Sequence, residues 1–263
     1  MKPLFVISCP FDTYSGYGAR ARDLVKAIIE TDKYDVKLLS QRWGVTPFGF
    51  CEDNPEWSFL YGYALNPQQS HPQPDIWMQI TVPNEFQPLG KFNIGCTAGI
   101  ESTICPPEWI EGINRMDLTL TSSEHSKKVF QESKFEKKDQ NTNQLIEKIE
   151  LNKPVEVIFE GANTNIYKVI ESNQIKTINL NSIKENFCYL FVGHWMDGEL
   201  GEDRKNVGLL VKAFYETFKK KNNKPVLILK TSKVGSSYVD REEILKKIKQ
   251  IKQTVNSKNL PNV

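Results

Sequence analysis

Two groups of residues in this chain have types and spacings suited to holding a phosphorylated ligand. The first is Gly16 and Gly18, which lie between an apolar run and a helical pattern expected to begin near Ala19. A strand, a glycine turn and a helix place backbone N–H groups at the carboxyl end of the strand, where phosphate or sugar hydroxyls can be held. The alternative is that both glycines only permit a tight turn.

The second group is basic. Gly193 closes an apolar run, and Arg204 and Lys205 precede a second helical pattern. Cations are unfavourable at the positive end of a helix dipole unless an anion offsets them, so the pair indicates a bound diphosphate. Lys230 ends the next apolar run, where a neighbouring parallel strand would direct it into the same crevice. The alternative is an ordinary solvated basic surface.

One carboxylate is placed where it could do chemistry. Glu101 follows an apolar run and a glycine, so it could protrude into a cleft as a general base or as a ligand of an acceptor hydroxyl. Alternatively it pairs with an arginine such as Arg115. The aromatic-rich stretch from Trp43 to Tyr63 could stack on a sugar, although packing in the core is the commoner outcome.

Composition excludes several classes of protein. The chain has 263 residues and a net charge of +2, which does not favour a nucleic-acid partner. Its five cysteines are widely spaced without a C-x-x-C pair, so we expect reduced thiols and no metal site. An apolar stretch of about 18 residues, as a transmembrane helix needs, does not occur. We expect a cytoplasmic protein, with peripheral association at a membrane surface as the alternative.

Strand and helix signals alternate along the chain, which is typical of an α/β fold with parallel sheets. Helical spacing follows Gly18, and Ser122 and Ser123 can cap a later helix. The runs with strand composition are Leu4–Ile7, Val36–Leu39, Ile76–Ile80, Phe92–Ile94, Leu118–Leu120, Val155–Phe159, Phe187–Val192 and Val226–Leu229.

Two local features are less regular. Residues 133–154 are polar, so we expect a solvated insertion with a short helical piece around Leu145–Ile149. Asp240 and Glu243 form a D-x-x-E pattern that predicts the cap of the last helix. The second βα series has only two convincing strands, too few to bury the faces of its helices.

Three ordered segments together resemble a known family. They are SGYGARARDLVKAI, DLTLTSSEHSKKVF with VEVIFEGANTNIY, and YLFVGHWMDGELGEDRKNVGLLVKAFYETF. This set is similar to the GT-B nucleotide-sugar glycosyltransferases, specifically the family 4-like group, over nearly the whole chain. The family's carboxylate motif E-x7-E is absent here, as is its helix returning to the first domain.

The resemblance implies two Rossmann-like domains with parallel sheets, the second incomplete. We expect an acceptor-side domain over residues 1–168 and part of a donor-side domain over 180–263. Gly16 and Gly18 match the family's glycine loop facing the donor, whereas Arg204, Lys205 and Lys230 match positions that contact the donor diphosphate. The resemblance also implies that no metal is required and that there is no cofactor, the nucleoside-diphosphate sugar being a co-substrate.

The function that follows is retaining transfer of a sugar from a nucleoside-diphosphate sugar to a glycan or other hydroxyl acceptor. A second polypeptide could complete the second domain. One alternative is a catalytically inactive or half-enzyme sugar-binding or assembly protein on the same scaffold. The other is an NADP-linked oxidoreductase with Arg42 on the 2′-phosphate; this is disfavoured because the glycine motif is incomplete.

Overall fold

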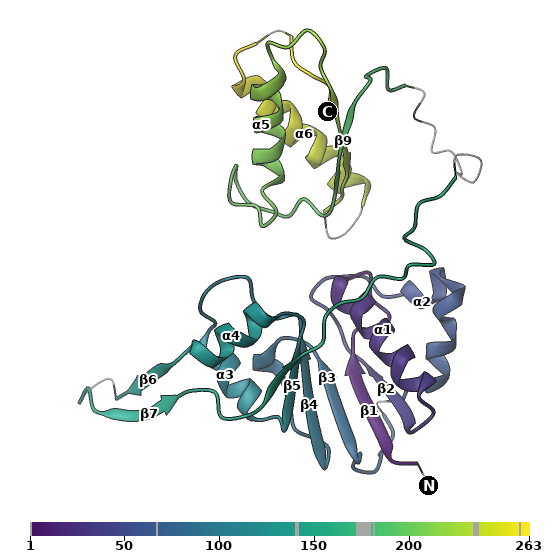
Figure 1. The fold of residues 1–263 in the computed structure, drawn as a ribbon, viewed down its shortest axis with the longest axis vertical. Helices are drawn as coiled ribbons and strands as arrows, with labels where there is room; N and C mark the ends of the chain where they lie inside the picture. The colour runs from purple at the N-terminus through teal and green to yellow at the C-terminus, as the bar shows by residue number, and fades with distance from the viewer. Residues whose placement is uncertain are drawn as a thin grey trace. The chain divides into compact units, whose positions relative to one another are not determined.

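The structure, a computed structural model, describes residues 2–66, 68–139, 142–171, 180, 182–233, 237–257 and 259–263 (Figure 1). The chain divides into two compact units, Met1–Ile166 and Tyr167–Val263. Residues 172–179, in the boundary region expected from the sequence, lie outside the described residues.

The first unit contains a six-stranded parallel sheet in the described part of the chain, with strand order β2-β1-β3-β4-β5-β8. The predicted α/β class with a parallel sheet is therefore confirmed. Because β2 and β3 flank β1 on opposite sides, the chain reverses its direction of winding at β1, and ligands of open α/β sheets bind outside the carboxyl ends at such a point. The strands are β1 Leu4–Cys9, β2 Asp35–Ser40, β3 Ile76–Ile80, β4 Phe92–Thr97, β5 Leu118–Thr121 and β8 Val155–Val157.

Helices cover both faces of this sheet. Alternate residues of β1 point to opposite sides, so Ile7 joins the core under α1, α2 and η1 while Val6 joins the core under α3 and α4. This double burial accounts for the continuous apolar runs of the strands. The helices are α1 Gly16–Glu30, α2 Phe50–Asp53, α3 Pro107–Asn114 and α4 Glu124–Glu132, with 3-10 turns η1 Pro55–Tyr63 and η2 Pro83–Glu85.

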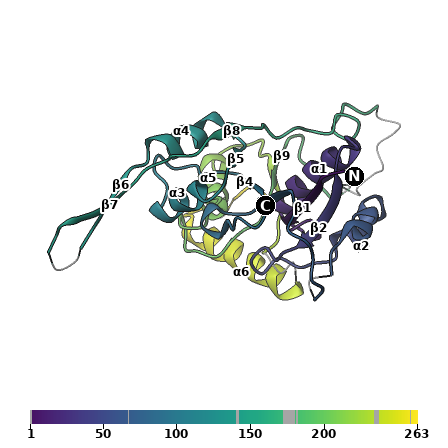
Figure 2. The same ribbon diagram turned by 90° about the horizontal axis from the view of Figure 1, so that it is seen from below.

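The predicted helical piece at Leu145–Ile149 is wrong. These residues form β7, which pairs antiparallel with β6, Phe135–Lys138, in a hairpin that projects from the sheet in Figures 1 and 2. The strand pairing places opposite charges across the hairpin at Glu136 and Lys148, an interaction that a short helix would not provide.

The second unit has a two-stranded parallel sheet among its described residues. β9, Cys188–Val192, pairs with β10, Val226–Lys230, and α5, Val207–Phe218, connects them. α5 and α6, Tyr238–Thr254, pack together on one face of this sheet. On the other face Leu190 is 66% and Val192 is 59% exposed.

The cap of α6 also differs from its prediction. Ser237 accepts a hydrogen bond from the Asp240 N–H, and Asp240 accepts one from the Ser237 N–H, which makes a capping box. Ser237 is therefore the cap of the helix, and Asp240 is its third residue. Glu243 is free to pair elsewhere.

Candidate functional site

Gly16 and Gly18 lie within the first turn of α1, not in a turn before it. Ser15 caps the helix by accepting a hydrogen bond from the Gly18 N–H at 2.9 Å, so α1 begins three residues earlier than expected. A Cβ on Gly18 would lie 2.5 Å from the Thr13 carbonyl oxygen, whereas one on Gly16 would meet nothing within 4 Å. Gly18 is thus required for packing, and Gly16 leaves the helix N-terminus approachable.

The loop before α1 is held by two buried charged residues that sequence reasoning missed. Asp12 accepts hydrogen bonds from the Cys51 N–H at 2.9 Å and the Tyr61 hydroxyl at 3.0 Å. Arg22 donates to the carbonyl oxygens of Phe11 and Thr13 at 2.7 and 3.0 Å. These contacts fix the backbone that presents Ser15 and Gly16.

Tyr17 links α1 to the carboxyl end of β4. Its hydroxyl lies 3.0 Å from Thr97 Oγ1 and accepts a hydrogen bond from the Ala98 N–H at 3.0 Å. The indole of Trp43 stacks on the Tyr17 ring with centroids 3.8 Å apart. The rest of the stretch from Trp43 to Tyr63 largely packs on the core, so its core interpretation holds for residues such as Trp57.

Glu101 is exposed in the loop after β4 and has no partner among the residues that the structure describes. The alternative of an ion pair with Arg115 is wrong, because Arg115 donates instead to the carbonyl oxygens of Phe86 and Asn84 at 2.9 Å each. Burial raises the pKa of the Tyr17 phenol, and the charge of Glu101 adds to that rise. Glu101 is three residues after Ala98, whose N–H donates to the Tyr17 hydroxyl, so Tyr17 contacts the loop that carries the carboxylate.

In the second unit, three predicted residues meet where β9 and β10 end. The Gly193 N–H donates to the Lys230 carbonyl oxygen at 3.1 Å, and a Cβ on Gly193 would lie 3.3 Å from Lys205 Nζ. Lys205 and Lys230 are exposed, and within the described ranges neither has an acidic partner. A flexible ammonium thus lies beside the glycine backbone at the carboxyl edge.

The helix dipole does not require an external anion here. Asp203 is 2% exposed and accepts hydrogen bonds from the N–H groups of Val207 and Gly208 at 2.8 and 3.2 Å. A residue of this chain therefore occupies the N-terminus of α5, which corrects the conflict inferred around Arg204 and Lys205. Arg204 is exposed, and no contact of its side chain is found in the described part of the chain.

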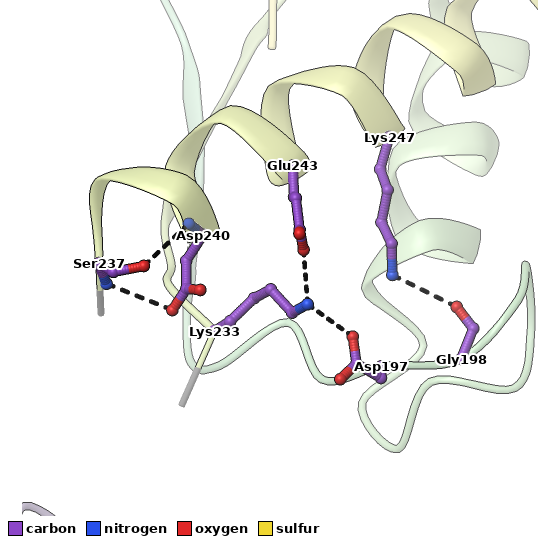
Figure 3. Close-up of polar contacts among 7 residues, drawn as sticks. All are labelled: Asp197, Gly198, Lys233, Ser237, Asp240, Glu243 and Lys247. Atoms are coloured by element: carbon purple, nitrogen blue, oxygen red, sulfur yellow. Dashed lines mark hydrogen bonds and ion pairs between the residues drawn. The ribbon is translucent and has the colours of Figure 1, made fainter. Parts of the chain in front are cut away.

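The loop that carries these cations is fastened to α6, as Figure 3 shows. Lys233 bridges Asp197, at 2.8 Å, and Glu243, at 2.6 Å. Lys247 of α6 donates to the Gly198 carbonyl oxygen at 3.4 Å. The two carboxylates raise the pKa of Lys233, and Lys233 lowers that of Asp197. We call Asp197, Lys233 and Glu243 the lysine clamp.

A cavity of about 770 Å³ lies between this loop and α6. Trp195, 2% exposed, and Ile251 contribute apolar surface, and Glu199 and Glu202 make its lining acidic. None of Arg204, Lys205 and Lys230 lines it. The cavity lining is therefore apolar and acidic, whereas the three basic residues lie outside it.

No group of three or more His, Cys, Asp or Glu side chains in the described residues is arranged to hold a metal ion. Among the same residues, no helix has the length and apolarity needed to cross a membrane. Arg42, the residue considered for an NADP phosphate, is exposed.

Comparison with protein-family models, with curated proteins and with solved structures gave no match for this chain. What the geometry defines is an α/β protein whose first unit has a six-stranded parallel sheet of Rossmann-like type.

Proposed function

We propose that the chain is a GT-B-like protein that takes part in retaining transfer of a sugar from a nucleoside-diphosphate sugar to a hydroxyl acceptor. The observation that carries this proposal is the closeness of Lys205 Nζ to Gly193, where a Cβ would lie 3.3 Å from it, at the carboxyl edge of β9 and β10. An ammonium without an acidic partner is suited to a diphosphate, and a glycine allows the phosphate to approach the backbone closely.

Each basic residue has a distinct role in the proposal. Lys205 and Lys230 neutralise charge that develops on the diphosphate as it leaves the sugar. Arg204, whose planar guanidinium can bind two phosphate oxygens at once, orients the leaving group. Asp203 holds the start of α5 so that its neighbours project from a fixed backbone.

The first unit supplies the acceptor side. Glu101 accepts a hydrogen bond from the acceptor hydroxyl or takes its proton. Gly16 leaves the N-terminus of α1 open to a ligand. A second polypeptide that covers the exposed side chains of β9 is also part of the proposal, supported by the exposure of Leu190 and Val192.

A transfer assay tests this function. The chain is incubated with UDP-, GDP- and ADP-hexoses and neutral saccharides, and mass spectrometry follows free nucleoside diphosphate and glycosylated product. We expect product with one donor. Glu101→Gln should lower product formation at least about tenfold without changing nucleotide affinity. Nucleotide binding without any product would favour the sugar-binding alternative instead.

A further inference from the structure

Exposed aromatic side chains gather beside the start of α1. Tyr14 is 39% and Phe48 is 43% exposed, and Trp43 is half-buried. An isolated bridge pairs Thr13 with Phe48, and the Tyr14 N–H donates to the Pro47 carbonyl oxygen, so the segment around Phe48 runs along the loop before α1. We call Tyr14, Trp43 and Phe48 the aromatic rim. Exposed aromatic side chains near one place in a fold can mark a binding site.

One face of the Trp43 ring packs against the ring of Tyr17. The two rings stack at an interplanar angle of 22°, and the Tyr17 hydroxyl is fixed by Thr97 and Ala98. Tyr17 packs on the core of the first unit, whereas Trp43 belongs to none of the three core clusters in the described part of the chain. One face of the indole is therefore held against a fixed ring while the side chain stays half exposed, which makes it a platform.

The polar group next to this platform is an acceptor of hydrogen bonds. Glu101 is exposed and has no hydrogen-bond or ion-pair partner in the described ranges, and it belongs to the loop after β4 whose Ala98 N–H donates to the Tyr17 hydroxyl at 3.0 Å. Carboxylate oxygens bind hydroxyl groups and repel phosphates. The nearby Arg20 is engaged, since it donates to the carbonyl oxygens of Ile158 and Phe159 at 2.7 and 3.3 Å.

We propose that Trp43, stacked on Tyr17, and Glu101, in the loop that the Tyr17 hydroxyl contacts, form a subsite for the ring of a neutral saccharide. The apolar C–H face of the sugar lies on the indole, and its hydroxyls donate to Glu101. The subsite rests on the proposed function in one respect: the bound sugar is the acceptor. Exposed Arg42 is the neighbouring cation, so comparing a neutral sugar with a uronate decides the charge of the ligand.

Saturation-transfer NMR of the full chain tests the subsite, with maltose, lactose and methyl α-mannoside as neutral probes and glucuronate as the anionic probe. We expect millimolar binding of at least one neutral probe, with transfer strongest to the C–H groups of one ring face. Trp43→Ala should weaken it at least about tenfold, Trp43→Phe about threefold, and Glu101→Gln about tenfold. Phe92→Ala, an exposed ring at the start of β4, is the matched control and should leave affinity unchanged.

Three results would overturn the subsite: no neutral probe binding at about 50 mM, unchanged affinity in Trp43→Ala, or tighter binding of glucuronate than of every neutral probe. Circular dichroism of each variant establishes that it is folded. The proposed function can fail while the subsite is correct. In that case the chain binds saccharides in a way that depends on Trp43 but binds no nucleoside diphosphate, which would contradict glycosyl transfer and not the subsite.

Discussion

Asp203 fills the N-terminus of α5 by accepting hydrogen bonds from Val207 and Gly208. Because the carboxylate is buried and both oxygens are used, Asp203→Ala should lower the free energy of unfolding of the second unit by about 1–2 kcal/mol. Asp203→Asn, which keeps one acceptor oxygen, should lose less. Chemical denaturation measures both, with exposed Glu202→Ala as the control. An Asp203→Ala protein as stable as the control would contradict this capping role.

Gly18 and Gly16 form a matched pair for testing the start of α1. A methyl group on Gly18 would meet Thr13 and Pro10 backbone oxygens at 2.5 and 2.9 Å, so Gly18→Ala should cost about 2 kcal/mol of stability. Gly16→Ala meets nothing and should change stability by less than about 1 kcal/mol, in the stabilising direction. Thermal unfolding distinguishes them. Equal effects of the two substitutions would show that the packing described for Gly18 is wrong.

The lysine clamp should keep the loop of residues 195–203 ordered. Lys233→Met removes both ion pairs, so we expect faster amide hydrogen exchange in this loop, and Lys233→Arg should restore slow exchange. Lys220→Met, at an exposed lysine beyond the other end of α5, is the control. Exchange that Lys233→Met leaves unaltered would mean that the clamp does not order the loop.

The clamp also has a defined dependence on pH. The folded pKa of Asp197 is below its ordinary value of 3.8, so its contribution is present above that value and is lost as the pH falls through the folded pKa. The folded pKa of Lys233 is above 10.5, so its contribution is present below that pH and is lost on further alkalinisation. Exchange in the loop should therefore accelerate, beyond its intrinsic pH dependence, at the acid extreme in the wild type but not in Lys233→Met.

Buried thiols predict how stability changes in alkali. Burial raises the pKa of Cys9 to about 12 and that of Cys96 to about 11, from an ordinary value of 9.0. Above pH 9.0 the unfolded chain loses these thiol protons while the folded chain keeps them. The free energy of unfolding is therefore unaffected below pH 9.0 and falls above it by about 1.4 kcal/mol per pH unit for each thiol. Urea unfolding between pH 8 and 10.5 measures this slope, which should be shallower in Cys96→Ala. At pH 8 an alkylating reagent should modify exposed Cys188 and spare Cys9.

Much of the first unit could be predicted from the sequence because its strands are buried on both faces. The run Ile76–Ile80 coincides with β3, and Ser123 caps α4 as expected. The hairpin of β6 and β7 could not be predicted, because its strands pair residues about ten positions apart in a polar segment. Long-range pairing leaves little signal within a window of five residues.

The positions of the site residues at the ends of strands and helices could be predicted from the sequence, whereas most of their side-chain contacts could not. Gly193 and Lys205 meet as the alternation of strands and helices implies. Asp203 lies four residues ahead of α5, and the residue directly before the helix is Asn206, so the usual sequence signal of a cap would have selected Asn206 and missed Asp203. The stack of Trp43 on Tyr17 has no sequence signal, since one ring comes from the loop after β2 and the other from α1, and only the folded chain brings them together.

The most direct test of the central claim is calorimetric titration of the purified chain with UDP, GDP and ADP, without added metal, in the wild type, in Arg204→Ala/Lys205→Ala and in Lys220→Ala. We expect one nucleotide to bind the wild type and the control equally, and the double variant to lose at least about tenfold in affinity. Unchanged affinity in the folded double variant, or no binding of any nucleotide to the wild type, would contradict a diphosphate site at the carboxyl edge of β9 and β10.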